Sequence, residues 1–176
     1  MAPAVAFDFD RFAVALHRER ERRGLGWYEL ADELWAQSAE LNSKRPDDHP
    51  LCGGAVGRLR VTGSASCQYA LFMLRWLGQA PEEFLTGTVV DVGDTTLIEP
   101  GPRYRLRWDL GALHEAVNDR RVAKRLTWAA LARELGCTPN RLTNLRTARQ
   151  ADLGLVMQVT QWLHRPAADF VHAAEW

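Results

Sequence analysis

The sequence predicts an all-α protein built from two tandem helical bundles, joined by an extended linker that can hold short strands. Apolar residues recur at helical spacing in both halves of the chain. Two blocks of sequence also occur twice in the same order, which is typical of a repeated structural unit. Between the halves, residues 86–109 are rich in Thr, Val, Gly and Pro, and this composition favours extended chain and turns.

The repeat becomes visible when the two halves are aligned. LGWYELADEL (25–34) matches LTWAALAREL (126–135), and RWLGQAPEEF (75–84) matches QWLHRPAADF (161–170). The first pair of blocks is offset by 101 residues and the second pair by 86, so the first copy holds 15 extra residues. We interpret the polar segment near 36–50 as an inserted loop.

The predicted organisation has three parts. They are a degenerate module 1 (residues 1–85), a linker (residues 86–104) and a module 2 (residues 105–176). In module 1, Phe9, Phe12, Ala13 and Leu16 predict a first helix, and similar spacing predicts a second and a fourth. Its third helix, within LCGGAVGRLR, is weak because each Gly costs about 1 kcal/mol of helix propensity relative to Ala.

Module 2 has clearer helix boundaries. Thr127 is a suitable N-cap for a helix over 128–135, and Gly136 suits the position after its end. Thr138 followed by proline predicts that the next helix spans about 139–146. The remaining predicted boundaries are an N-cap at Asp152 and a short last helix that begins near Pro166.

The segment LTWAALARELGCTPNRLTNLRTAR (126–149) resembles the Cro/λ-repressor-like (XRE) helix-turn-helix family, and the likeness extends over nearly all of module 2. The family often has Gln early in the second helix, whereas this chain has Trp128, matched by Trp27 in module 1. We interpret both as packing residues. Module 1 resembles the family in its first, second and fourth helices. The resemblance therefore predicts two tandem λ-repressor-like helix-turn-helix bundles in an all-α chain. The family's pattern is filled by Leu126-Thr127, Leu131-Ala132, Gly136, Thr138-Pro139, Leu142 and Leu145.

The resemblance implies a sequence-specific transcription regulator whose helix near 139–146 enters the major groove of double-stranded DNA. Residues that point away from the apolar stripe are expected to meet base edges, and these are Asn140, Arg141, Thr143 and Asn144. Flanking polar residues are expected to hold phosphates, and these are Thr127, Thr138, Arg146, Thr147, Arg149 and Gln150.

The charge distribution favours this reading although the formal net charge is zero. Residues 120–149 hold eight Arg or Lys and one acid, whereas residues 82–99 hold five acids and no Arg or Lys. A local basic surface of this kind attracts a phosphate backbone. The alternative explanation is a solvated basic helix face.

Module 1 is expected to serve dimerisation, partner binding or spacing. It has Gly54 and Gly57 in place of Asn140 and Thr143, and residues 18–60 carry eight basic and eight acidic residues. Two alternatives stay open. Both modules could contact DNA as a pseudo-dimer within one chain, or the fold could be a protein-interaction module or antitoxin-like regulator that binds a protein partner. Members of the resembled family commonly act as homodimers.

Other functional classes find little support in the sequence. There is no Gly-rich phosphate loop, nucleophile elbow or HExxH motif, so no enzyme is predicted. His49, Cys52 and Cys67 lack a fourth ligand at zinc-site spacing, and no metal or cofactor is expected. No run of about 18 apolar residues and no signal peptide is present, so no membrane partner is expected. Three scattered cysteines favour a cytoplasmic protein, and the excess of Arg over Lys suits a bacterial genome.

Overall fold

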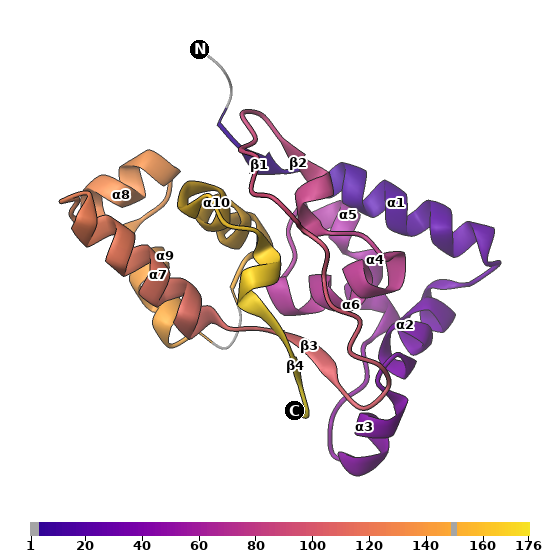
Figure 1. The fold of residues 1–176 in the computed structure, drawn as a ribbon. Coiled ribbons are helices and arrows are strands. Elements are labelled where there is room, and N and C mark those ends of the chain that lie inside the picture. Colours follow the sequence, from indigo (N-terminus) through magenta and orange to yellow (C-terminus); the bar gives the residue numbers. More distant parts are fainter. Residues whose placement is uncertain (1–3, 149–150) are drawn as a thin grey trace.

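Apart from the additional helix α3 in module 1, the two halves of the chain fold with the same order of elements (Figure 1). The computed structural model describes residues 4–148 and 151–176. In module 1 the elements are β1 (Ala6–Phe7), α1 (Phe9–Arg22), α2 (Trp27–Ala36), α3 (Ala39–Lys44), α4 (Gly53–Gly57), α5 (Leu59–Thr62), α6 (Cys67–Leu77), η1 (Pro81–Phe84) and β2 (Leu85–Thr86). In module 2 they are β3 (Arg105–Trp108), α7 (Leu110–Ala123), α8 (Trp128–Leu135), α9 (Pro139–Thr143), η2 (Asn144–Arg146), α10 (Leu153–Leu163), η3 (Ala167–Phe170) and β4 (Val171–Ala174).

The predicted all-α class is wrong, because each module also contains a small antiparallel sheet. β1 pairs with β2, with Phe7 opposite Leu85, and β3 pairs with β4, with Trp108 opposite Val171. The chain enters and leaves each module side by side, so the two segments satisfy each other's backbone groups. Strands of two to four residues are too short to show alternation in the sequence. In the segment 86–109, where short strands were expected, Thr86 ends β2 and residues 105–108 form β3, whereas residues 87–104 contain no strand.

Local capping explains where the main helices of module 2 begin and end. The Thr127 side chain accepts a hydrogen bond from the Ala130 backbone N at 3.1 Å, and Gly136 ends α8 at a φ of 66°. Asp109 and Asp152 cap α7 and α10 in the same way. The predicted helix over 139–146 is α9 followed directly by the 3₁₀ turn η2.

The segment interpreted as an inserted loop contains α3, which packs against the linker. Ser38, which is fully buried, donates from its hydroxyl to the Tyr104 carbonyl at 2.7 Å. The Leu41 backbone N donates to the Pro102 carbonyl at 3.2 Å. The buried Arg105 guanidinium binds an Asp48 carboxylate oxygen at 2.7 Å. The insertion therefore holds the linker in place, at the bottom right of Figure 1.

The two modules meet about an approximate twofold axis. Ser66 and Asp152, which are equivalent in the repeat, pair antiparallel with each other as an isolated bridge. Around them, the Cys67 N donates to the Ala151 carbonyl at 2.7 Å, and the Leu153 N donates to the Ala65 carbonyl at 3.0 Å. In Figure 1 a half-turn about the line of sight brings α8 to α2 and the β1–β2 sheet to the β3–β4 sheet. This is the geometry of a symmetric dimer, formed within one chain.

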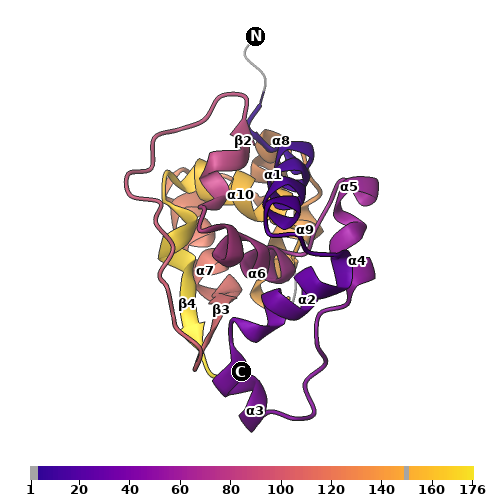
Figure 2. The same cartoon turned by 90° about the vertical axis from the view of Figure 1, so that its right-hand side faces the viewer.

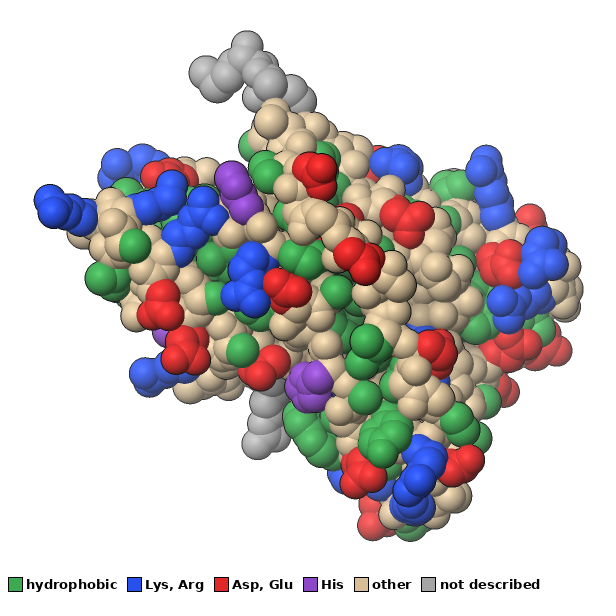
Figure 3. All heavy atoms as spheres, viewed as in Figure 1, with side chains coloured by type: hydrophobic (Ala, Val, Ile, Leu, Met, Phe, Trp, Pro, Cys, Tyr) green, Lys and Arg blue, Asp and Glu red, His purple; other side chains and the backbone are tan. Residues whose placement is uncertain are grey.

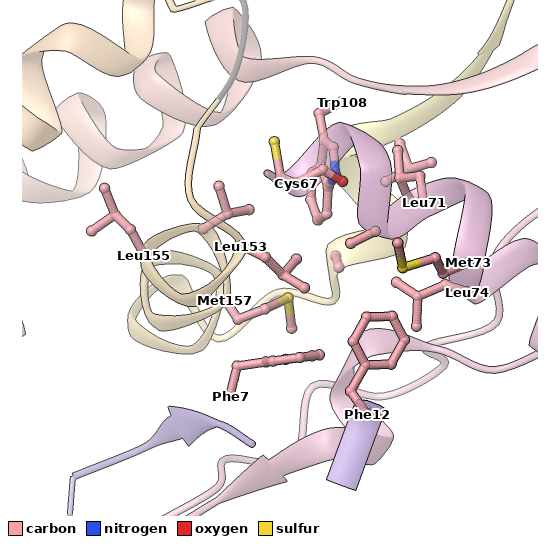
Figure 4. Packing of buried hydrophobic residues seen from close by; sticks show 14 of the residues in the cluster. Phe7, Phe12, Cys67, Leu71, Met73, Leu74, Trp108, Leu153, Leu155 and Met157 are labelled. Carbon is pink, nitrogen blue, oxygen red and sulfur yellow. The ribbon is translucent and has the colours of Figure 1, made fainter. Parts of the chain in front are cut away.

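The modules share one hydrophobic core. β1 of module 1 packs on α10 of module 2, and β3 of module 2 packs on α6 of module 1. Figure 4 shows Phe7 facing Met157 across this boundary, with Trp108 beside Cys67. The Trp108 Nε1 donates to the Cys67 carbonyl at 2.9 Å. In the part of the chain that the structure describes, no helix has both the length and the apolar character needed to span a membrane.

Candidate nucleic-acid interface

The helix-turn-helix of module 2 presents one polar face to solvent. α8 packs on α9, and Leu142 and Leu145 are 0% and 2% exposed because they point from α9 and η2 into the core. Every predicted base-contacting or phosphate-contacting residue within the described chain is exposed, and these are Thr127, Thr138, Asn140, Arg141, Thr143, Asn144, Arg146 and Thr147. The two other predicted phosphate contacts, Arg149 and Gln150, lie outside the described residues.

Several basic side chains of module 2 lie on aromatic rings. The Arg121 guanidinium carbon lies 4.6 Å from the ring centre of Trp128, and Arg120 and Lys124 both approach Trp162. An aromatic ring holds a cation without cancelling its charge. Among the residues that the structure describes, the ion pairs within module 2 are Arg141–Asp152 at 3.7 Å and Arg165–Asp169 at 2.9 Å, and Arg105 of β3 pairs with Asp48 of module 1.

In module 1, Arg20 and Arg23 also lie on Trp rings, but more of the basic side chains are paired with carboxylates. Arg22 and Arg23 both bind Glu19, at 2.6 Å and 2.8 Å, and their hydrogen bonds lower the pKa of Glu19 to about 2. Arg45 likewise binds Asp48 at 2.8 Å. Figure 3 shows the result: Lys and Arg gather at the upper left over α8 and the end of α7, whereas red and blue side chains mix on the right. Figure 3 views the side of the linker and β4; over the described chain as a whole, more basic side chains of module 2 than of module 1 lack a carboxylate partner.

A polar hollow of about 480 Å³ borders the predicted face. Its walls combine α7, the start of α8 and the end of the third helical segment. They are formed by His114, Asn118, Trp128, Thr143, Asn144, Arg146 and Thr147. The His114 ring stacks on Trp128 with centroids 5.3 Å apart. Burial lowers the pKa of His114, and the positive charges of Arg146 and Arg121 lower it further.

The sequence interpretation had not placed His114, Asn118 and Trp128 in this site. It assigned no role to His114 or Asn118 and interpreted Trp128 as a packing residue. The available signal was the four-residue spacing of His114 and Asn118, which puts both side chains on one face of α7. That spacing alone does not tell which element lies opposite, so the hollow could only be seen in three dimensions.

Matches to known proteins do not decide what this surface binds. The chain matches no protein-family model, no curated protein and no solved structure. The resemblance to the Cro/λ-repressor-like family therefore stays a prediction that rests on residues 126–149.

The cysteines and acidic residues offer no second chemical site in the described chain. Within residues 4–148 and 151–176, no three His, Cys, Asp or Glu side chains cluster in a way that could hold a metal ion. Cys67 is buried, and burial raises the pKa of its thiol to about 11. Cys52 is exposed, and its sulfur accepts a hydrogen bond from the Ala55 N at the start of α4.

Proposed function

We propose that the protein is a sequence-specific DNA-binding regulator that reads the major groove with α9 and η2 of module 2. The observation that carries this proposal is the exposed polar face opposite Leu142 and Leu145, set among basic side chains that few carboxylates neutralise. Asn140 and Asn144 can pair with adenine, and Arg141 with guanine. Thr138, Arg146 and Thr147 flank them and would contact phosphates.

The charge distribution also supports this face of module 2 as the DNA-binding surface. A duplex attracts uncompensated cations, and each phosphate that a Lys or Arg neutralises steepens the fall of affinity with salt. The arrangement of Arg121 and Arg146 around His114 forms a local positive field beside the reading face. The linker, which carries Asp91, Asp94 and Glu99, runs on the side away from α9 in Figure 2, so these carboxylates would not oppose an approaching duplex.

A salt-titrated gel shift with genomic fragments tests the proposal directly. We expect binding whose logarithm falls linearly and steeply with the logarithm of salt concentration. Asn144→Ala should then cost about 1–3 kcal/mol of affinity and relax the preference at one base position. Arg165→Ala, at a residue paired with Asp169 outside the reading face, is the matched control. Absence of salt-sensitive binding would reject the proposal, as would an unchanged preference in Asn144→Ala.

A protein-binding role through module 1 is a second candidate function. Tyr28 is 81% exposed and Val61 is 86% exposed, so both side chains are accessible to a partner protein. Tyr28→Ser together with Val61→Ser should abolish capture of that partner while leaving the base preference of module 2 unchanged. If the double variant instead weakens DNA binding, these side chains belong to the nucleic-acid surface.

A further inference from the structure

The twofold arrangement of the modules places their two third-helix segments on one side of the molecule. Figure 2 shows α4 and α5 at the right-hand edge and α9 right of centre, while the linker and β4 lie at the left. The pairing of Ser66 with Asp152 fixes the axis between them, because these residues are the N-caps of α6 and α10, the helices that follow the third-helix segments in the two modules. A single chain therefore presents two related surfaces in the same direction.

A DNA duplex has twofold axes of its own, perpendicular to its length. Proteins with twofold symmetry use this match to place one recognition helix in each of two half-sites. Such proteins are commonly dimers of two chains. Here the symmetric contact is already made within one chain, through the backbone bonds of Cys67 and Leu153 with Ala151 and Ala65.

The two surfaces are not equivalent in chemistry. At the positions of Asn140, Arg141 and Thr143, module 1 has Gly54, Ala55 and Gly57. These residues have no side chain that could hydrogen-bond a base edge. The position of Asn144 is taken by Arg58, which is exposed and has no carboxylate partner among the described residues.

Arg58 also lies close to the axis. It borders an open hollow of about 490 Å³ whose wall includes Asp152 of module 2. The Asp152 carboxylate pairs with Arg141 rather than with Arg58. The charge of Arg58 therefore stays available on the face that both modules share, and a phosphate is the anion that a duplex would bring there.

We propose that one chain covers both half-sites of a DNA duplex and reads only one of them. Module 2 contacts bases in its half-site. Module 1 lies over the second half-site and holds the phosphate backbone through Arg58, without reading sequence. The bound site is therefore non-palindromic and is occupied by a single chain. This inference rests on the proposed DNA-binding function.

The experiment begins with a duplex selected by the full chain from a library with about 30 randomised base pairs, roughly three helical turns. Hydroxyl-radical footprinting and the binding stoichiometry are then measured on that duplex. We expect one block of specified bases, one chain per duplex, and backbone protection that extends about one helical turn beyond the specified block on one side.

Variants of Arg58 test the role of module 1 separately. Arg58→Ala should lower the slope of log Kd against log salt by about 1 and shorten the footprint on the unspecified side. Arg58→Lys should keep the wild-type slope, because it keeps the charge. Arg103→Ala is the matched control, since Arg103 is exposed on the linker, which lies on the opposite side in Figure 2.

The outcomes separate this inference from the function on which it rests. Specific binding with protection confined to the specified block would overturn the inference and leave the DNA-binding function intact. A palindromic selected site bound by two chains would do the same, as would an unchanged salt slope in Arg58→Ala. Failure to select any duplex would overturn both.

Discussion

The second helices of the two modules are held by the same contacts, whereas their third helices are built differently. Arg20 in module 1 and Arg121 in module 2 each donate to the carbonyl that precedes the next helix, those of Leu25 and Leu126. Each Arg also covers a Trp ring, at 4.4 Å for Arg20 and 4.6 Å for Arg121. Contacts kept in both copies serve the scaffold, so function must be sought where the copies differ.

The difference is concentrated in the hollow between the first and third helical segments. In module 2 this hollow is polar and includes His114 and Arg146. The equivalent hollow in module 1 is smaller, about 270 Å³, and mostly apolar, with Leu16, Trp27 and Val56 among its walls. The two modules are therefore similar frames, of which one carries polar and basic side chains at this hollow and the other carries mostly apolar side chains.

The largest expected effect is on the unfolding free energy, and it tests whether the two modules unfold as one unit. Leu142→Ala removes a fully buried side chain under the reading face and should cost about 2–5 kcal/mol of unfolding free energy. Its module 1 counterpart, Val56→Ala, removes one carbon fewer and should cost less by about 0.8 kcal/mol or more. Urea unfolding followed by circular dichroism measures both.

Because the two modules share a core, each of these variants should shift a single transition. A second, separate transition in Leu142→Ala would show that module 2 unfolds independently. A larger cost for Val56→Ala would contradict the packing described for α4.

The sequence predicted the features that depend on contacts between residues close together in the chain. It did not predict those that depend on residues far apart in the chain. The starts of α8 and α10 were predicted because Thr127 and Asp152 cap them through bonds within three residues. The exposed face of α9 followed from the positions of Leu142 and Leu145. Short strands were expected within 86–109, where β3 lies, but its pairing with β4 was missed because the paired residues are 63 or more positions apart in the sequence. The hollow was missed because it requires α7 to be placed against η2.

Two glycines of α4, Gly53 and Gly57, should respond to alanine substitution with changes in stability of opposite sign. Both changes should be smaller than that of Leu142→Ala. A Cβ at Gly57 would meet no atom within 4 Å, so Gly57→Ala should raise stability by about 0.5–1 kcal/mol by restricting the unfolded chain. A Cβ at Gly53 would lie 3.0 Å from Tyr28 Cδ1 and 3.2 Å from the Trp27 carbonyl oxygen, so Gly53→Ala should destabilise. Thermal unfolding of both variants compares them.

Equal effects of these two substitutions would contradict the close approach of α2 and α4. Gly57→Ala should also leave DNA binding unchanged, since the Ala methyl group adds no base-reading group to module 1.

The polar hollow of module 2 predicts that the stability of the protein depends on pH. Burial and the charges of Arg146 and Arg121 lower the pKa of His114 below its ordinary value of 6.5. The unfolded chain therefore takes up this proton at a higher pH than the folded chain does. The stability that neutral His114 contributes is complete above pH 6.5 and is lost as the pH falls through the lowered pKa.

Urea midpoints at about pH 7.5 and about pH 5.5 measure this loss. His114→Asn should reduce the difference between the two midpoints. His164→Asn, at an exposed residue beyond the end of α10, should leave it as in the wild type. The assignment to His114 fails if both variants show the wild-type difference.

The smallest expected effect concerns the residues on the twofold axis itself. Ser66 caps α6 with a neutral hydroxyl, whereas Asp152 caps α10 with a carboxylate that also pairs with Arg141. Asp152→Ser would make the two caps chemically equivalent and keep a good N-cap oxygen, so stability should change little.

In the same variant, Arg141 would lose a partner that competes with a guanine for its guanidinium group. Because both side chains of this pair are partly exposed, the pair contributes only about 0.2–1 kcal/mol. DNA affinity should therefore rise by up to about fivefold in a gel shift, whereas a fall would mean that Asp152 orients Arg141 for binding rather than restraining it.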